Sequence, residues 1–527
     1  MLRLIDSLTY LGRDINLQDY QFSTPNSLNA VLDKYKMSGA LVCSFTCAML
    51  DIEYGNTMLF KALEGEKRLW PCPAVLPNGC GETGNEERYL DGLIEKGARF
   101  CCLLHASSGT SLDRRIIGSL FAALEKRRLP VALFSTATSA AATLAEAYPR
   151  LPIVLHIPNT RDRIFWPLFK QTPNLYFSMA ANYSHYRGLE FCLRENGADR
   201  ILFASGYPVS EPGAAVANLF YSDLKESDRR KIASENCERL MTSVKAGGKK
   251  RKVILTQSPE LKTGQSGINN ISSVVWERKP APWNGIVDMH AHYGKWREFP
   301  IWGGAADDLV REMDRLGVAK ILVAHQACMT PDVVWGNDQV LAAMRKYPGR
   351  IGGYACCYPV DKKLGIGEIT RCIEAGMTGI KLHNANGLAY TDSRYRPVWE
   401  YADRLRLPVL LHTWGDISSY EQIFKKYRHA PILLGHSGSR NPESYVKFAR
   451  KYLNLYLDLT LSAAPYGLVE YFVREAGADR ILYGSDALWM SMQHQIGRVL
   501  FADISNADKI NILVKNPRRI LKGIRHG

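Results

Sequence analysis

Short apolar runs alternate with longer amphipathic segments along both halves of this 527-residue chain. In the first half, runs of strand length are separated by segments with helical periodicity, such as residues 112–126. Strands that alternate with helices are typical of a parallel sheet, and eight such units predict a (β/α)₈ barrel. The expected strands are 2–5, 39–43, 69–75, 100–104, 130–134, 152–156, 175–178 and 200–204.

The second half repeats this plan. Residues 196–205 match residues 476–485 at a spacing of 280, and residues 128–131 match 406–409 at a spacing of 278. Ordered matches at a steady spacing predict a tandem duplication, and therefore two tandem (β/α)₈ TIM-type barrels in the α/β class. The expected strands of the second copy are 285–289, 320–323, 351–356, 379–383, 408–412, 431–435, 455–458 and 480–485.

The composition changes between the two halves. Residues 246–282 are rich in glycine, serine, lysine and asparagine, and they end in Lys-Pro-Ala-Pro. Such a stretch is typical of a linker. We therefore expect a first barrel over residues 1–245, a linker over 246–282 and a second barrel over 283–527.

Polar side chains gather where the apolar runs of the second half end. His290 and His292 stand two apart, and residues two apart on a strand face the same side. Active sites of (β/α)₈ barrels form at the carboxyl ends of the strands. The other residues at such ends are Lys381, His383, His412, His436 and Asp486. Imidazoles and a carboxylate around one ring predict a divalent metal site of His₃Asp type.

The first half carries different residues at these places. The replacements are Leu8 for His290, Tyr10 for His292, Leu103 for Lys381, Phe134 for His412, Ile157 for His436 and Gly206 for Asp486. Only His105 remains, opposite His383. Apolar side chains do not bind metal ions, so we expect the first barrel to be catalytically silent. His156, one residue before the matching position, is expected to face away from the ring.

Five motifs of the second half resemble the amidohydrolase superfamily. They are Asp-Met-His-Ala-His, Gly-Ile-Lys-Leu-His, Leu-Leu-His-Thr-Trp, Leu-Gly-His-Ser-Gly and Tyr-Gly-Ser-Asp. More narrowly, they resemble the amidohydrolase-related branch that contains aminocarboxymuconate-semialdehyde decarboxylase. The first half resembles this branch only as a degenerate copy. The resemblance implies one divalent metal ion per chain, zinc with Mn²⁺ or Fe²⁺ as alternatives, held by His290, His292, His412 and Asp486.

The remaining residues are given roles by this comparison and by their chemistry. Asp486 is expected to take a proton from the attacking water and pass it to the leaving group, and His436 to orient that water or stabilise a developing oxyanion. Asp288 is expected to fix the tautomer of an imidazole. The side chains expected to contact substrate are Lys381, His383, Arg297 and Trp414. For Lys381, a structural role stays open.

Three functions remain open at this point. The leading one is a metal-dependent hydrolase that acts on a small-molecule ester, lactone or amide. The alternative is a nonoxidative decarboxylase of a small aromatic or unsaturated acid, which needs a cation such as Arg297 for the substrate carboxylate. A non-catalytic binding or assembly module is a third class. The first barrel is expected to serve as an internal pseudo-dimer partner, and further homo-oligomerisation stays open.

Charge and cysteine content limit the expected binding partners and the expected cellular compartment of the protein. The formal charge is +15, but the basic residues are scattered, and their one cluster, residues 249–252, lies in the linker. We therefore expect a small-molecule substrate, with an anionic one as an option, and no nucleic acid. No apolar run reaches the roughly 18 residues of a membrane span, and the first residues do not form a signal peptide. Twelve cysteines without a framework of spacings predict reduced thiols in a cytoplasmic protein.

Overall fold

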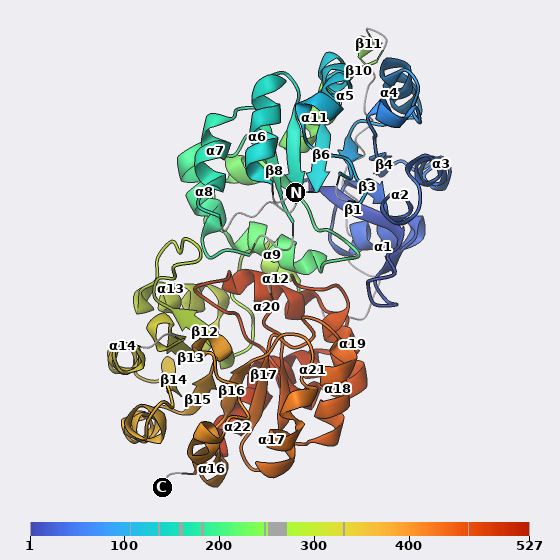
Figure 1. Ribbon diagram of the computed structural model, residues 1–527. Helices are drawn as coiled ribbons and strands as arrows, with labels where there is room; N and C mark the ends of the chain where they lie inside the picture. The colour runs from blue at the N-terminus through green and yellow to red at the C-terminus, as the bar shows by residue number, and fades with distance from the viewer. Residues whose placement is uncertain are drawn as a thin grey trace. The chain divides into compact units, whose positions relative to one another are not determined.

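The computed structural model describes residues 2–105, 107–134, 137–156, 162–180, 184–246, 249–250, 271–329, 332–461 and 463–525. The chain divides into two compact units, which are described separately below (Figure 1). The first unit comprises residues 1–183 and 187–266, and the second comprises residues 184–186 and 267–527. Within the ranges given above, every helix is too short or too polar to cross a bilayer.

The second unit is built on eight parallel strands that pair in chain order. The strands are β12 (Ile286–Tyr293), β13 (Val318–His325), β14 (Ile351–Cys356), β15 (Gly379–Leu382), β16 (Val409–His412), β17 (Ile432–Gly435), β18 (Leu455–Asp458) and β19 (Ile481–Leu482). The Met289 N–H donates to the Tyr483 carbonyl at 3.0 Å, which joins the first strand to the chain after the last. The result is a nearly closed parallel barrel, as the sequence predicts.

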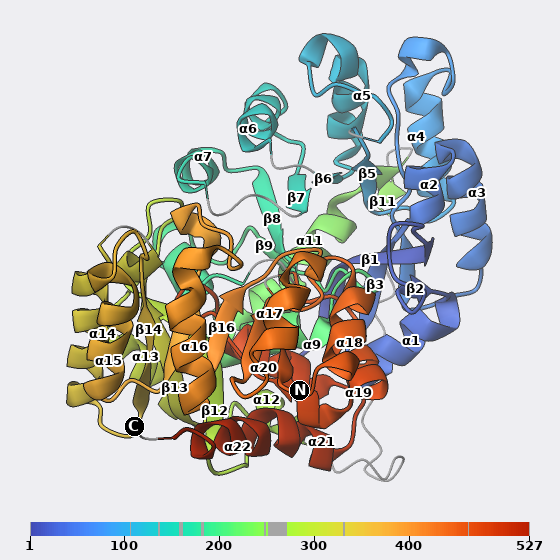
Figure 2. The same cartoon turned by 60° about the horizontal axis from the view of Figure 1, so that its bottom comes forward.

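Helices surround these strands (Figure 2). They are α12 (Ser273–Trp276), α13 (Ala306–Leu316), α14 (Val333–Lys346), α15 (Glu368–Glu374), α16 (Arg396–Leu405), α17 (Glu421–Lys426), α18 (Pro442–Lys451), α19 (Leu468–Ala476), α20 (Met492–Phe501), α21 (Asn506–Ile510) and α22 (Asn516–Lys522). Helix α13 shows why they pack there, because its buried Leu309, Met313 and Leu316 recur at helical spacing and form one apolar face. With helices outside, strands such as β17 are buried along their whole length and consist of apolar residues and glycine.

Three strands of the second unit differ from their predicted bounds by two residues or more. Strand β13 extends two residues beyond the predicted 320–323 at each end. Strand β12 continues to Tyr293, so His290 and His292 lie within the strand rather than after it. Strand β19 has only two residues, because the chain leaves the ladder for a turn in which Asp486 has a φ of 60°. Positive φ is uncommon outside glycine, and aspartate is among the residues enriched there.

The first unit contains two main sheets. One has the order β2-β1-β3-β4 and the other the order β5 to β9. Isolated parallel bridges pair Thr9 with Tyr207 and Ala74 with Cys102. The strands are β1 (Ile5–Arg13), β2 (Phe22–Ser23), β3 (Gly39–Ser44), β4 (Leu69–Pro71), β5 (Cys101–Leu103), β6 (Val131–Phe134), β7 (Ile153–His156), β8 (Leu175–Met179) and β9 (Ile201–Phe203). A separate pair joins β10 (Lys245–Ala246) to β11 (Lys249–Lys250).

The helices of the first unit follow its strands. They are α1 (Pro25–Lys34), α2 (Phe45–Met49), α3 (Ile52–Ala62), α4 (Glu86–Glu95), α5 (Arg114–Arg127), α6 (Thr138–Ala147), α7 (Phe165–Gln171), α8 (Gly188–Asn196), α9 (Pro212–Tyr221), α10 (Glu226–Arg230) and α11 (Asn236–Ser243). Most of the predicted linker, at 247–248 and 251–270, lies outside the described residues.

A buried aspartate joins the first strand to the last in both units. Asp6 accepts from the Ser205 N–H at 2.9 Å, and Asp288 accepts from the Ser485 N–H at 3.1 Å. Each carboxylate also accepts the amide two residues along its own strand, at 3.1 Å. Burial raises the pKa of Asp6 to about 7 and that of Asp288 to about 8. Asp288 therefore holds the backbone, and the prediction that it fixes an imidazole tautomer is wrong.

Strand register corrects one alignment between the units. Cys101 pairs with Val131, and Ile380 pairs with Val409, which is the matched position in the repeat. Cys102 rather than Leu103 therefore takes the place of Lys381. By the same count, Leu104 and not His105 corresponds to His383.

The expected orientation of His156 is also wrong. Its Nδ1 lies 2.7 Å from the Ser178 hydroxyl oxygen, and its ring centroid lies 5.2 Å from that of Phe134. Phe134 stands in the place of His412, so His156 points to the same side as that residue. Strand alternation accounts for this, because Val154, two residues earlier, lies in the buried core. Ile157, expected opposite His436, lies outside the described residues.

Candidate metal centre

Three predicted ligands of the second unit meet at one point. The Nε2 atoms of His290 and His292 are 3.2 Å apart. Asp486 Oδ1 lies 3.7 Å from His290 Nε2 and 3.5 Å from His292 Nε2. All three residues are buried, and their ligand atoms lie within 4.8 Å of one another. Imidazole nitrogens with a carboxylate oxygen form a donor set for a divalent transition metal.

The protonation of the two histidines fits this use. His290 Nδ1 forms a short hydrogen bond with Asp458 Oδ2, and His292 Nδ1 lies 3.4 Å from the Ala324 carbonyl oxygen. These acceptors place the imidazole protons on Nδ1, so both Nε2 lone pairs face the same point. Burial, and then the nearby Lys381, hold the pKa of both rings well below the ordinary value. Two neutral rings with lone pairs this close fit a cation between them.

Three further imidazoles continue the ring. The centroid of His436 lies 5.1 Å from that of His290 and 4.7 Å from that of His412, which in turn lies 4.3 Å from His383. Burial lowers the pKa of His436 to about 4 and that of His383 to about 3. It lowers the pKa of His412 further still. All are therefore neutral at neutral pH, as metal ligands must be.

The second nitrogens of these rings differ in their partners. His436 Nδ1 lies 2.9 Å from the Thr460 carbonyl oxygen, which leaves its Nε2 for the interior of the ring. His436 has a φ of 61°, a conformation uncommon for residues other than glycine. His412 Nδ1 is buried without a hydrogen-bond partner among the described residues. A buried nitrogen without a partner is costly, which is consistent with an atom kept for a ligand.

Lys381 lies inside the ring. Its Nζ is 3.0 Å from His290 Nε2, and the side chain is buried. Burial lowers the pKa of this amine, while Asp486 and Asp458 oppose the shift. Because this lowered pKa, about 8, is still above neutral pH, the lysine brings a positive charge next to the three converging ligands.

Two predicted substrate contacts lie further out. Trp414 is 53% exposed, and its ring centroid lies 5.8 Å from that of His436. Arg297 is exposed in the loop after β12 and lines a hollow of about 480 Å³ with His325 and Gln326. None of the ring residues lines this hollow. The structure thus places Trp414 at the rim of the ring and does not bring Arg297 into it.

Two glycines make room for His290. A Cβ at Gly435 would lie 3.0 Å from His290 Cε1, and a Cβ at Gly484 would lie 2.7 Å from His290 Cβ. A Cβ at Gly484 would also clash with Asp458 Oδ1. In the first unit the matched positions carry His156 and Ala204. Backbone without a side chain is therefore required where the ring forms.

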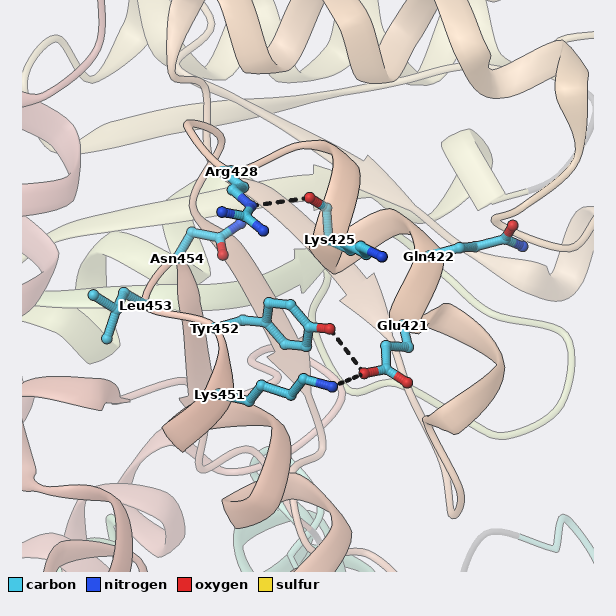
Figure 3. A pocket seen from close by; sticks show the side chains of 8 residues that line it. All are labelled: Glu421, Gln422, Lys425, Arg428, Lys451, Tyr452, Leu453 and Asn454. Carbon is cyan, nitrogen blue, oxygen red and sulfur yellow. Dashed lines mark hydrogen bonds and ion pairs between the residues drawn. The ribbon is translucent and has the colours of Figure 1, made fainter.

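A larger hollow of about 860 Å³ lies elsewhere on the second unit (Figure 3). It is lined by α17, the end of α18 and the residues that precede β18. Glu421 accepts hydrogen bonds from Lys451 Nζ and, at 2.8 Å, from the Tyr452 hydroxyl. The hollow lies where β18 begins, whereas barrel active sites form where strands end. It is therefore not the candidate site.

Asp458 is the site residue that the sequence reasoning missed. It ends β18, and its Oδ1 accepts hydrogen bonds from the Thr460 N–H at 3.1 Å and hydroxyl at 2.8 Å. These bonds aim Oδ2 at His290. The signal was present in the sequence, because Asp458 ends an apolar run and its matched position in the first half is Ser178.

Replacing Asp458 with asparagine is expected to lower the affinity of the second unit for a divalent metal about tenfold or more. Asparagine offers a neutral amide oxygen in place of the carboxylate, and this weaker acceptor holds the His290 proton on Nδ1 less firmly. Isothermal titration with Zn²⁺ measures the effect. Ser178→Ala, at the matched position of the first unit, is the control and should leave the affinity unchanged. Equal affinity in Asp458→Asn and the wild type would contradict this role.

Comparison with known families agrees with the geometry. The sequence pattern of the family described as "Amidohydrolase" matches residues 59–241 and 287–523. The two matches together cover most of the chain and fall in both units. The chain belongs to the amidohydrolase family, and it is an enzyme of the kind that hydrolyses or decarboxylates its substrate.

Two curated relatives have the same recorded activity. A gamma-resorcylate decarboxylase of Polaromonas sp. (strain JS666 / ATCC BAA-500) is 24% identical over 284 residues, which cover 41% of this chain and 87% of the relative. Another from Rhodococcus jostii (strain RHA1) is 22% identical over 248 residues, which cover 35% of this chain and 75% of the relative.

Solved structures also match about half of the chain. A 2,6-dihydroxybenzoate decarboxylase complexed with 2,6-dihydroxybenzoate has a TM-score of 0.39 at 18% identity, over 46% of this chain and 100% of its own. A dihydroxybenzoic acid decarboxylase from Polaromonas sp. JS666, with bound manganese and the inhibitor 2-nitroresorcinol, has a TM-score of 0.38 at 20% identity, over 46% and 97%. A probable 2-pyrone-4,6-dicarboxylic acid hydrolase from Acinetobacter baumannii has a TM-score of 0.38 at 14% identity, over 45% and 99%.

Proposed function

We propose that this protein is a metal-dependent, nonoxidative decarboxylase of a small aromatic carboxylic acid, and that its second unit carries the reaction. The observation that carries the proposal is the convergence of His290, His292 and Asp486 beside the buried cation Lys381. The curated relatives are named as decarboxylases, which favours this reaction over the hydrolase that the sequence motifs placed first. Decarboxylation is the alternative reaction that the sequence predicts.

The donor set suits one divalent metal ion. His290, His292, His412 and Asp486 would hold it, with zinc expected from the nitrogen and carboxylate donors and Mn²⁺ or Fe²⁺ as alternatives. When bound, such an ion neutralises negative charge on the substrate and polarises the oxygen that it contacts. Asp458 and the Ala324 carbonyl would keep the two imidazoles oriented.

The protein groups of the ring supply what decarboxylation needs. The carbon that bears the carboxylate must receive a proton, and the bond to the carboxylate then breaks as carbon dioxide leaves and its electron pair returns to the aromatic ring. Asp486 is assigned as the group that delivers this proton from its carboxyl oxygen, and His436 as the group that orients the substrate beside it. Burial of the ring residues excludes water, which strengthens their interactions with charge.

Lys381 is assigned to hold an anionic group of the substrate. Replacing it with methionine keeps its length and removes the charge, and we expect KM for the acid to rise about 10- to 100-fold. Steady-state kinetics of carbon dioxide release measure this change. The metal content should stay at the wild-type level, because Lys381 is not among the proposed ligands.

Lys320→Met is the matched control for that variant. Lys320 is a half-buried lysine whose pKa is lowered by burial, and it lies near the start of β13, away from the carboxyl ends of the strands where the ring forms. The control should keep the wild-type KM. If Lys381→Met also kept the wild-type KM, the amine would have a structural role. The sequence leaves that hypothesis open.

The first unit is proposed to be a second, catalytically silent barrel of the same family. Its candidate ring carries Leu8, Tyr10, Phe134 and Gly206, and none of these side chains supplies an imidazole or carboxylate. We propose that it acts as an internal partner for the second unit. Production of residues 280–527 alone tests this role, which fails if the fragment is folded, monomeric and as active as the full chain.

The proposed reaction is tested by offering the metal-loaded full chain both kinds of substrate. One set contains aromatic acids, beginning with 2,6-dihydroxybenzoate, and the other contains aryl esters, lactones and amides. We expect carbon dioxide release from an aromatic acid and no hydrolysis. Hydrolysis without carbon dioxide release would support the hydrolase hypothesis instead. Turnover of neither set by a metal-loaded protein would favour a binding or assembly module.

A further inference from the structure

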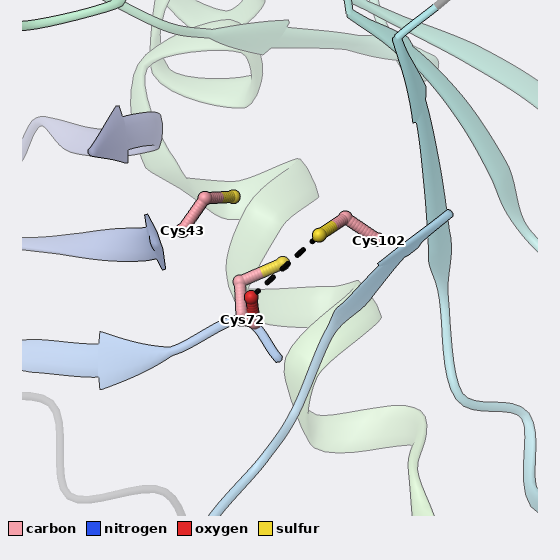
Figure 4. Close-up of side chains that lie close together, drawn as sticks. All are labelled: Cys43, Cys72 and Cys102. Atoms are coloured by element: carbon pink, nitrogen blue, oxygen red, sulfur yellow. Dashed lines mark hydrogen bonds between the residues drawn. The ribbon is translucent and has the colours of Figure 1, made fainter. Parts of the chain in front are cut away.

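Three cysteines of the first unit meet in its interior. Cys43 lies on β3, Cys72 follows β4 directly, and Cys102 lies on β5. Their sulfur atoms lie within 4.8 Å of one another, and the side chains point toward a common centre (Figure 4). The three residues are 3%, 2% and 1% exposed. A free thiol is present at each position.

The surroundings of this cluster are apolar. Leu8, Leu41, Ala74 and Phe100 belong to the same buried core as the three cysteines. No carboxylate or imidazole joins the sulfurs in the group that the described residues form. Thiolates are soft ligands, and a site made of sulfur alone selects soft ions such as Cu(I) or Zn²⁺ over Mg²⁺, Ca²⁺ or Mn²⁺.

The cluster is not inherited from the shared barrel plan. By strand register, the second unit carries Ala324, Tyr354 and Lys381 at the matched positions. These three side chains have nothing in common. Packing alone therefore does not require sulfur at any of the three places, yet the first unit has it at all of them.

Cys47 shows what a purely structural cysteine looks like in this protein. Its sulfur lies 3.4 Å from the amide oxygen of Asn56. In the second unit, Cys328 and Asn337 form the same contact at 3.4 Å. A cysteine that the fold requires thus recurs in both units, whereas the three-cysteine cluster occurs in one.

The cluster also spans a seam between two sheets. Strands β3 and β4 belong to the sheet β2-β1-β3-β4, whereas β5 begins the sheet of β5 to β9. The two sheets are joined at this place by a single bridge, between Ala74 and Cys102, rather than by a ladder. An ion bound to all three sulfurs would tie the two sheets together where their pairing is thinnest.

We propose that Cys43, Cys72 and Cys102 form a binding site for one soft, thiophilic metal ion, Cu(I) or Zn²⁺, that fastens the two sheets of the first unit. Binding involves no redox step. Each sulfur that becomes a ligand forms a bond to the ion and releases its proton to solvent.

The test uses the full chain, produced in cells supplied with added copper or zinc and purified with a reductant and without oxygen. Metal analysis and X-ray absorption at the copper or zinc edge give the content and the ligands of each ion. We expect one ion per chain with three sulfur ligands, which is distinct from the nitrogen and oxygen ligands of the ring in the second unit. If neither metal were bound through sulfur, the proposal would be wrong.

Variants locate the site. Cys43→Ser, Cys72→Ser and Cys102→Ser should each lower sulfur-bound metal at least about tenfold, because each removes one of three ligands. Cys101→Ser is the control, since Cys101 is equally buried on β5 and its sulfur lies 3.5 Å from the Pro130 carbonyl instead. Equal loss in the control would overturn the assignment. If a variant did not fold, the sulfur count of the wild type would still decide the question.

Discussion

Replacing both His290 and His292 with alanine is expected to lower kcat/KM at least about 10³-fold, because a bound metal ion supplies several kcal/mol of charge stabilisation in the transition state. The reason lies in their geometry. Their Nε2 atoms are 3.2 Å apart, and both face Asp486. Without them, the proposed site retains His412 and Asp486 alone. Kinetics of carbon dioxide release measure the rate, and metal analysis of the same samples should show the loss of bound metal.

His429→Ala is the control for this double variant. His429 is exposed, and its backbone N–H donates to Asp403 Oδ1 at 2.7 Å. Both its activity and its metal content should match the wild type. A double variant that loses metal but keeps its rate would show that the reaction does not depend on the metal at this site. One that keeps its metal would place the ion elsewhere.

Replacing Asp486 with asparagine is expected to lower kcat about 10²- to 10⁴-fold, the usual contribution of a positioned acid or base. Asparagine has nearly the same shape and accepts the same φ of 60°. It cannot deliver a proton as a carboxylic acid does. The barrel closure should survive, because the Asp486 N–H, which donates to the His290 carbonyl at 2.8 Å, is a backbone group. Single-turnover measurements of carbon dioxide release isolate the chemical step.

Two observations decide how the Asp486 result is read. The metal content of Asp486→Asn measures the role of Asp486 as a metal ligand. The rate of the same variant in excess Mn²⁺ then measures its role in proton transfer. Asp479→Asn is the matched control, because Asp479 is an exposed aspartate seven residues earlier in the same unit. A metal-loaded Asp486→Asn variant within about twofold of the wild-type rate would exclude Asp486 as the proton donor.

The barrel of the second unit could be predicted because its strands are buried on both faces and read as apolar runs. The predicted bounds of β14 and β18 agree with the structure. The ends of β12 and β19 could not be predicted in the same way. They depend on how the first and last strands close the ring, through Met289 and Tyr483, and closure is a property of distant residues rather than of local pattern.

The ring of the site could be predicted from the strand ends, but not its supporting contacts. The shared face of His290 and His292 follows from strand alternation. The partner of the His290 Nδ1 does not, because Asp458 reaches it from a strand 168 residues away. Likewise, the motif Asp-Met-His suggested that Asp288 serves the metal ligands, whereas its bonds go to backbone amides.

The first unit shows how far a one-residue error carries. The sequence aligned Leu103 with Lys381, and the ladder moves Cys102 to that place. Because side chains alternate along a strand, a shift of one residue changes which side chain faces the barrel interior. The corrected register assigns the interior position to Cys102 instead of Leu103. The cluster of Cys43, Cys72 and Cys102 was invisible until the register was known. Register depends on pairing between strands, and a single strand carries little information about it.

The central claim is that one divalent metal ion sits among His290, His292, His412 and Asp486 and that the first unit holds none in the matching place. Anomalous X-ray scattering from crystals of the full chain soaked in Mn²⁺ tests this claim directly. The account predicts one strong manganese peak among these four side chains and no manganese peak beside Leu8, Tyr10 and Phe134. A manganese peak beside those three residues, or no manganese peak in the ring of the second unit, would contradict it.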